Sequence, residues 1–193
     1  MLKESSNSKI KIYMKNLKIV VSEESFHSKE VYDIIASNIS MVNLIREEGG
    51  MIEKDIHPDA LLSYLVDYYI AQYKNGNFSQ IVWNSGADLD FLEKVEEGLE
   101  KMGAKEHLAL LQKQVKVLKD MDYEVLEAFL ETDYFGTNPT RDALKNDDFY
   151  SIKEDEVELN AKWLRNHPDL AVLSIEDMYR YAEKVLGTTI VRE

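Results

Sequence analysis

The chain has 193 residues, is 45% hydrophobic and carries a formal net charge of −13 at pH 7. This length and hydrophobic content allow one ordinary core and predict a single domain. An acidic field of this strength repels nucleic acids and membrane surfaces, which argues against direct binding to either. The absence of cysteine excludes disulfides, thiolate metal sites and cysteine nucleophiles.

The negative charge is concentrated after the amino-terminal segment. Residues 1–21 hold five lysines and one glutamate, a net charge of +4, which leaves −17 on the other 172 residues. Ile10 to Val21 loosely alternates lysine with apolar residues, as a half-exposed strand does, but we favour an unanchored leader and keep the strand as the alternative. Its apolar run is too short for a signal peptide or membrane span, so we expect a cytoplasmic protein. We predict a basic leader at 1–25, an acidic helical domain at 26–187 and a tail at 188–193.

Helical periodicity begins at Ser28 and continues to the breaking pair Gly49-Gly50. Pro58 begins a second helix, which we expect to be the central buried one and to end at Asn75-Gly76 with the glycine in the left-handed conformation. Its apolar positions, three and four residues apart, are Leu61, Leu62, Leu65, Tyr68, Tyr69 and Tyr73. A short helix through Phe78 follows and ends at Asn84-Ser85-Gly86.

The later helices are indicated by their end signals. Ser85 or Asp88 is expected to cap a helix that stops at Gly103. Two more helices follow, at Leu108 to Leu118 and at Tyr123 to Leu130, and helical periodicity resumes twice before the stop at Pro168. Asn138 is expected to cap a helix that begins at Pro139, and a capping box from Ser174 begins the last helix. The sequence predicts an all-α protein, a compact single-domain bundle of roughly seven to nine helices.

No arrangement of residues indicates a catalytic mechanism. The four histidines lack metal-ligand spacing, and we interpret them as helix-end or surface residues: His27, His57, His107 and His167. The chain has no phosphate-binding glycine loop, no GxSxG motif and no EF-hand loop. We therefore predict no catalytic residue, no metal and no cofactor, and expect a protein that is not an enzyme.

Two rows of carboxylates recur at three- and four-residue intervals, typical of one helical face. The first row is Asp90, Glu93, Glu97 and Glu100, and the second is Asp120, Glu124, Glu127 and Glu131. Residues 120–140 contain no lysine or arginine. Each step places carboxylates roughly 5 to 6 Å apart along the helix axis. This distance is comparable with that between every second phosphate of a DNA strand, in which successive phosphates are about 3.4 Å apart along the axis. Such rows could imitate a nucleic-acid backbone, or simply keep the helices soluble.

Amide side chains alternate with aromatic residues around the predicted end of the second helix. They are Gln72, Asn75, Asn77, Gln80 and Asn84. Such a cluster could line a small-molecule pocket. We favour a structural interpretation, in which the amides bond backbone groups left unpaired where one helix stops and another starts.

The run Asn75-Gly76-Asn77-Phe78-Ser79-Gln80, followed by Trp83-Asn84-Ser85, resembles the signature of a bacterial domain family that includes an acidic DNA-mimic protein. The signature positions are Gln72, Asn75, Gly76, Phe78, Gln80, Trp83 and Asn84. Asn77 stands where the family has a second glycine, and asparagine is the substitute that best accepts a left-handed backbone. The resemblance implies an all-α domain, often dimeric, and no catalytic residue. The family's characterised member occupies the DNA-binding face of a helix-turn-helix transcription factor.

Charge and resemblance together predict an acidic DNA mimic that binds and blocks a basic nucleic-acid-binding partner, such as a helix-turn-helix transcription factor, through the two carboxylate rows. The resemblance also leaves a homodimer open. Two other functions stay open. One is an immunity or antitoxin-like protein that neutralises a basic toxin, and the other is a small-molecule-binding domain built around Gln72, Gln80 and Trp83.

Overall fold

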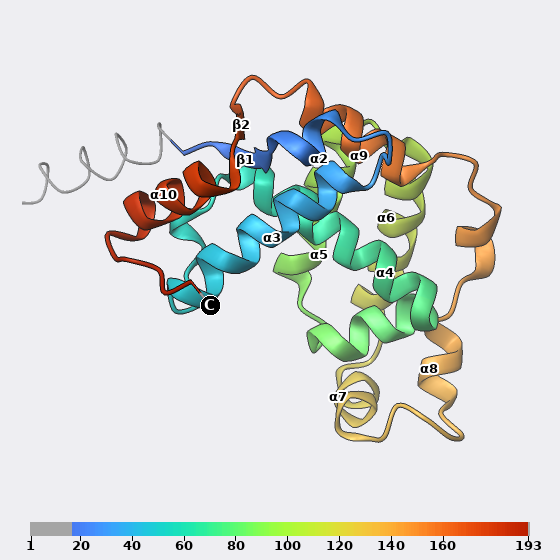
Figure 1. The fold of residues 1–193 in the computed structure, drawn as a ribbon. Coiled ribbons are helices and arrows are strands. Elements are labelled where there is room, and N and C mark those ends of the chain that lie inside the picture. Colours follow the sequence, from blue (N-terminus) through green and yellow to red (C-terminus); the bar gives the residue numbers. More distant parts are fainter. Residues whose placement is uncertain (1–16, 193) are drawn as a thin grey trace, which may run out of the picture. The chain divides into compact units, whose positions relative to one another are not determined.

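The structure, a computed structural model, describes residues 17–192, and within that range it contains nine α-helices and two short strands (Figure 1). The predicted all-α class and helix number are confirmed. The leader lysines before residue 17 lie outside the described residues. The elements are β1 (Ile19–Ser22), α2 (Glu23–His27), α3 (Asp33–Glu48), the 3-10 turn η1 (Glu53–Asp55), α4 (Pro58–Ser85), α5 (Leu89–Met102), α6 (Lys105–Lys119), α7 (Tyr123–Glu131), α8 (Pro139–Leu144), the 3-10 turn η2 (Asp147–Ser151), α9 (Glu156–Arg165), β2 (Leu170–Leu173) and α10 (Ile175–Leu186).

The chain divides into two compact units. Among the described residues, the first unit combines 17–64 with 160–192, and the second is Leu65–Leu159. Both boundaries fall within helices, because α4 and α9 each begin in one unit and end in the other. Each unit therefore has its own set of packed elements.

In the first unit, β1 and β2 form a two-stranded parallel sheet in which Ile19 pairs with Leu170. The amino-terminal strand was predicted as an alternative to a leader, but it is not half-exposed: all four of its residues are buried, because α3 and α10 both contact it. We did not predict β2. Its run Leu170–Leu173 is too short to distinguish from a buried helical turn by periodicity.

Helix ends follow the predicted caps. Asp88 accepts a hydrogen bond from the Phe91 amide (3.0 Å) at the start of α5, and Gly103 ends that helix with φ 79°. Asn138 caps α8, and Ser174 caps α10. These positions agree with prediction because a cap depends on neighbouring residues.

The break in α4 occurs where predicted, but with a different geometry. Gly76 is not left-handed: its φ is −158°, and Asn77 has the positive φ, 68° with ψ −172°. That region is normally restricted to glycine. Gly76 is required for another reason, because a Cβ there would lie 2.8 Å from the Gln80 Cβ. The kink therefore depends on close packing at Gly76 and on strain at Asn77.

The second unit is built around the part of α4 that follows Tyr64. Tyr69, Tyr73 and Phe78 are buried to 1% exposure or less. They share this core with the buried faces of α5 and α6, represented by Leu92, Leu99 and Leu111. α4 is buried as predicted, and α5 and α6 pack against each other.

Candidate partner-binding surface

The first predicted row of carboxylates lies on the exposed face of α5. This face is opposite the buried stripe of Leu92, Val95, Leu99 and Met102. Two members of the row contact lysines: Lys101 Nζ lies 2.7 Å from Glu97 Oε1, and Lys119 Nζ lies 3.9 Å from Glu93 Oε1. Asp90 and Glu100 are exposed and form no ion pair among the described residues. Half of this row is therefore partly neutralised.

The second row is shorter than predicted, because Asp120 ends α6 instead of belonging to α7. Asp120 also lies 3.5 Å from Lys116 Nζ. Glu124, Glu127 and Glu131 are exposed along α7, and at 3.6 residues per turn they face away from Phe129, the buried residue of that helix. Within residues 17–192 these three glutamates have no lysine or arginine partner, so α7 carries uncompensated negative charge.

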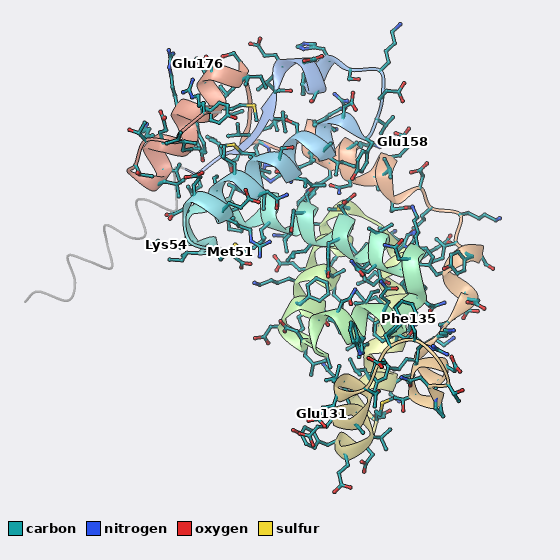
Figure 2. All side chains as sticks on the ribbon, turned by 60° about the horizontal axis from the view of Figure 1, so that its bottom comes forward. Met51, Lys54, Glu131, Phe135, Glu158 and Glu176 are labelled. Atoms are coloured by element: carbon teal, nitrogen blue, oxygen red, sulfur yellow. The ribbon has the colours of Figure 1, made fainter. Side chains whose placement is uncertain are left out.

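Large apolar side chains accompany this charge. Tyr123 is 73% exposed, Val125 is 46% exposed and Phe135, in the loop after α7, is 85% exposed. Figure 2 labels Glu131 and Phe135 at the α7 end of the second unit. We define the α7 surface as Tyr123, Glu124, Val125, Glu127, Glu131 and Phe135. It combines carboxylates with aromatic groups, and both are available to a partner.

The two carboxylate rows approach each other at one end only. α5 and α6 are joined by the short turn at Gly103 and Ala104, so the end of α6 returns to the beginning of α5, as the contact between Lys119 and Glu93 shows. α7 starts from that same end. Asp90 and Glu93 therefore lie toward α7, whereas Glu100 lies toward the other end of the hairpin.

A third group of carboxylates, between 147 and 158, has structural roles. Glu154 accepts hydrogen bonds from the backbone amides of Lys105 (3.0 Å) and Glu106 (2.7 Å) at the beginning of α6. Glu156 pairs with Lys74 at 2.6 Å. Asp148 pairs with Lys113 at 3.1 Å. These three carboxylates serve in capping and pairing, so they add little to the anionic surface.

The signature residues of α4 hold the loop that follows α7. Trp83 Nε1 donates to the Thr132 carbonyl oxygen at 3.2 Å. The Tyr134 hydroxyl donates to the Gly76 carbonyl at 2.8 Å and lies 3.0 Å from Ser79 Oγ. Because Phe135 is next to Tyr134, these contacts fix the base of an otherwise exposed aromatic residue.

The kink also binds the segment before η2. Asn77 Oδ1 accepts hydrogen bonds from the Phe78 amide (2.8 Å) and the Asn146 amide (2.7 Å), and its Nδ2 donates to Asp147 at 2.9 Å. The buried Tyr73 hydroxyl lies 2.8 Å from the Asn146 carbonyl, and burial raises the pKa of Tyr73. These bonds compensate the strained backbone of Asn77.

Three of the remaining amides, those of Gln72, Gln80 and Asn84, bond to one another. Gln72 Oε1 accepts hydrogen bonds from Asn84 Nδ2 at 2.6 Å and, more weakly, from Gln80 Nε2 at 3.4 Å. Asn77 bonds backbone amides at the helix junction, as the structural interpretation of the cluster requires. Gln72, Gln80 and Asn84 instead bond side chains of the same cluster.

Two of the dispersed histidines meet in the first unit, which we did not predict. His57 and His167 each begin a His-Pro-Asp tripeptide, and this repeat was the available sequence signal. In each turn the aspartate amide donates to its own histidine Nδ1 at 3.1 Å. His167 Nε2 lies 2.9 Å from Asp59 Oδ2, and His57 Nε2 lies 3.7 Å from Asp169 Oδ2. The two turns are reciprocally paired.

Within the part of the chain that the structure describes, no group of three or more histidine, aspartate or glutamate side chains is arranged to hold a metal ion. Over the same residues, none of the helices combines the length and apolar character needed to cross a bilayer.

Comparison with known proteins places the signature within a recognised family. A family model described as DMP19-like protein matches residues 54–167, which include all of α4 to α9. No curated protein and no solved structure matches the chain significantly. The matched segment contains both carboxylate rows and the kink.

Proposed function

The chain belongs to the DMP19-like family, a DNA-mimic family, and from this premise we propose that it binds a basic nucleic-acid-binding protein and blocks its DNA-binding face. A helix-turn-helix transcription factor is the partner class that we favour. The protein would thereby act in transcription regulation in a bacterial cytoplasm. The proposed mechanism contains no catalytic step and needs no cofactor.

The α7 surface is the observation that supports this proposal most directly. Residues 120–140 carry six carboxylates and no lysine or arginine, and Glu124, Glu127 and Glu131 are exposed on one face of α7. A DNA-binding protein presents lysine and arginine side chains at the spacing of phosphates. Carboxylates on a rigid helix offer those side chains the charge that DNA would offer.

Charge and apolar contacts have separate parts in the mechanism. The carboxylates steer the encounter and exclude acidic partners, and this contribution weakens as salt is added. Tyr123 and Phe135 supply contacts that salt does not screen, because burial of apolar surface depends on area and not on charge. We assign partner selection to these two residues.

Of the two carboxylate rows, we assign the larger part to α7. Glu93 and Glu97 on α5 contact lysines, which lowers the charge they offer to a partner. Asp90 lies toward α7 and extends its surface. If the protein forms the homodimer that the family resemblance implies, we place the interface away from α7, because two copies of an acidic surface repel each other.

The test compares two triple variants with the same net charge. The α7 variant combines Glu124→Lys, Glu127→Lys and Glu131→Lys. The control variant carries the same change at three glutamates that are exposed elsewhere: Glu24→Lys, Glu30→Lys and Glu158→Lys. Partners are captured from the native cytosol at low and high salt and identified by mass spectrometry. Each purified partner is then bound to DNA, and displacement of the DNA by the protein is measured by gel shift.

We expect the native protein and the second triple variant to displace DNA at low salt, and the α7 variant to fail. Circular dichroism verifies that both variants are folded. Equal displacement by the α7 variant would refute the role of α7. A captured partner that does not bind nucleic acid would refute the DNA-mimic function and direct attention to the antitoxin alternative.

A further inference from the structure

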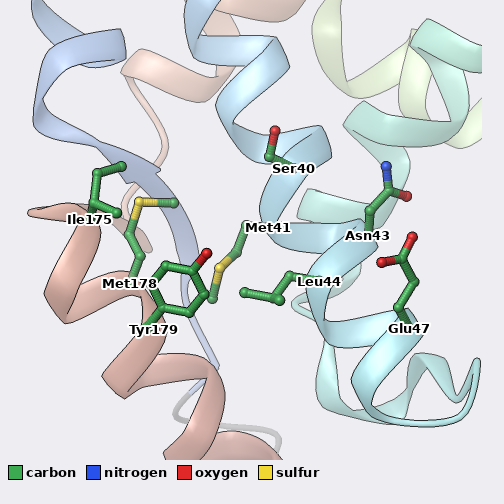
Figure 3. A pocket seen from close by; sticks show the side chains of 8 residues that line it. All are labelled: Ser40, Met41, Asn43, Leu44, Glu47, Ile175, Met178 and Tyr179. Carbon is green, nitrogen blue, oxygen red and sulfur yellow. The ribbon is translucent and has the colours of Figure 1, made fainter. Parts of the chain in front are cut away.

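A pocket of about 300 Å³ lies between α3 and α10 in the first unit (Figure 3). Met41 and Met178, which are 4% and 8% exposed, form its buried part, and Leu44 and Tyr179 complete the apolar lining. Methionine side chains are flexible and polarisable, so they adapt to ligands of different shape. The volume corresponds to about ten water-sized groups, at the lower end of the range for ligand sites.

One side of this pocket is polar. Asn43 and Glu47 lie four residues apart on α3 and therefore on the same face of that helix; Figure 3 shows their side-chain ends close together, away from Ile175 and Met178 of α10. Glu47 is the charged residue that lines the pocket. Among residues 17–192 it has no ion-pair partner, and its carboxylate is exposed.

The two arginines next to the α10 lining of the pocket, Arg180 and Arg192, are paired with carboxylates other than Glu47. The Arg192 guanidinium lies over the Tyr179 ring, 4.7 Å from its centroid, but it is paired with Glu176 and Glu183. Arg180 is likewise paired with Glu176 and Asp177. The pocket thus has an apolar body and one uncompensated negative group at its edge.

We propose that this pocket binds a small apolar amine. The hydrocarbon part occupies the space between Met41, Leu44, Met178 and Tyr179, and the ammonium group lies at Glu47 with Asn43 as a hydrogen-bond acceptor. Glu47 would repel a carboxylate ligand, and a neutral ligand would form no ion pair with Glu47. The pocket shares no residue with the α7 surface, and its lining residues lie outside the segment 54–167 matched by the family.

The probes are 2-phenylethylamine, 2-phenylethanol and phenylacetate, which share one ring and differ in their charged group. Each is titrated into the full chain at low salt, and binding is followed through the methyl resonances of ¹³C-labelled methionines. We expect the amine to shift the Met41 and Met178 resonances. Because an exposed ion pair contributes little, its Kd should be about two- to fivefold lower than that of the alcohol, and phenylacetate should bind most weakly.

Two substitutions locate the ammonium group. Glu47→Gln should raise the Kd of the amine to that of the alcohol, whereas Glu48→Gln, a matched change at the next exposed residue outside the pocket lining, should leave the preference intact. The proposal is overturned if the amine and the alcohol bind equally to the native chain, if Glu47→Gln keeps the preference, or if the amine shifts neither methionine. None of these outcomes depends on partner capture by α7.

Discussion

The imidazole rings of His57 and His167 pack edge to face with their centroids 5.4 Å apart. Each Nδ1 accepts a hydrogen bond from the backbone of its own turn, so in the neutral ring the proton lies on Nε2, toward the aspartate of the other turn. Lys18, just before β1, bonds Asp169 at 2.6 Å. The pair therefore connects the beginnings of β1, α4 and β2.

This arrangement predicts pH-dependent stability. Burial lowers the pKa of His57 below its ordinary value of 6.5, an effect that Asp59 opposes and the neighbouring His167 reinforces. Between the lowered pKa and 6.5, the unfolded chain binds more protons than the folded chain. The free energy of unfolding should therefore fall as pH decreases through this window, by at most about 1.4 kcal/mol per pH unit for one proton.

The pH dependence of the free energy of unfolding is measured by urea unfolding at several pH values between 7.5 and 5. The proteins compared are the native chain, His57→Gln and His27→Gln. His57→Gln should flatten the pH dependence, whereas replacement of the exposed His27 should not change it. The lowered pKa of Asp169, caused mainly by its hydrogen bond with Lys18, affects stability only at more acidic pH, as the aspartate protonates. An unchanged slope in His57→Gln would contradict the assignment.

Asn77 provides a second prediction, on the kink of α4. Its backbone has φ 68° and ψ −172°, and its side chain bonds Phe78, Asn146 and Asp147. Asn77→Ala keeps the strain and loses the bonds, so we expect a loss of about 1–3 kcal/mol in the free energy of unfolding. Asn77→Gly loses the bonds but relieves the strain, and should be less destabilising than alanine.

Chemical denaturation of both variants checks this order, with Asn75→Ala as the control. Asn75 is exposed on the same turn, and its replacement should alter stability by no more than about 0.5 kcal/mol. Equal losses in Asn77→Ala and Asn77→Gly would show that the positive φ stores no strain.

The helix ends could be predicted from sequence because their causes are local. Asp88, Asn138 and Ser174 cap helices that begin within one turn of them, and Gly103 ends α5 without help from distant residues. The position of the α4 break was predictable for the same reason. Its geometry was not, because it depends on contacts of Asn77 with residues near 146 that only the folded chain brings together.

The candidate surface was predictable in composition but not in charge balance. The α7 glutamates were identified from their spacing and from the absence of nearby basic residues in sequence. The pairing of Glu93 with Lys119 and the capping of α6 by Glu154 join residues far apart in the chain, so a count of carboxylates could not distinguish binding groups from structural ones. The pairing of β2 with β1 and the packing of His57 against His167 also join residues far apart in the chain, so neither was predictable from local patterns.

Glu154 and Glu127 should therefore respond in opposite ways to replacement. Glu154→Ala removes the acceptor for the first amides of α6, and we expect a loss of about 0.5–2 kcal/mol in stability with partner capture retained. Glu127→Ala removes an exposed group whose one side-chain hydrogen bond within residues 17–192 is accepted from the Tyr123 hydroxyl. It should change stability by no more than about 0.5 kcal/mol and weaken capture at low salt. Thermal melts measure stability, and capture assays measure partner binding. Loss of capture by a folded Glu154→Ala variant would show that Glu154 belongs to the binding surface.

Phe135 allows the apolar part of the proposed interface to be separated from the charged part. Because its side chain is 85% exposed, Phe135→Ala should leave the melting temperature unchanged. Burial of a phenylalanine against a partner contributes about 1.5–3 kcal/mol, so affinity should fall by about ten- to one-hundredfold.

This loss in Phe135→Ala should be the same fold-change at low and high salt, since apolar burial is not screened, whereas the loss caused by the α7 charge reversal should shrink as salt increases. Val191→Ala, at a residue 87% exposed in the other unit, should change neither stability nor affinity. Titration of the purified partner at two salt concentrations measures all three variants. If Phe135→Ala binds as tightly as the native chain, the aromatic residue does not contact the partner, and recognition rests on the carboxylates of α7.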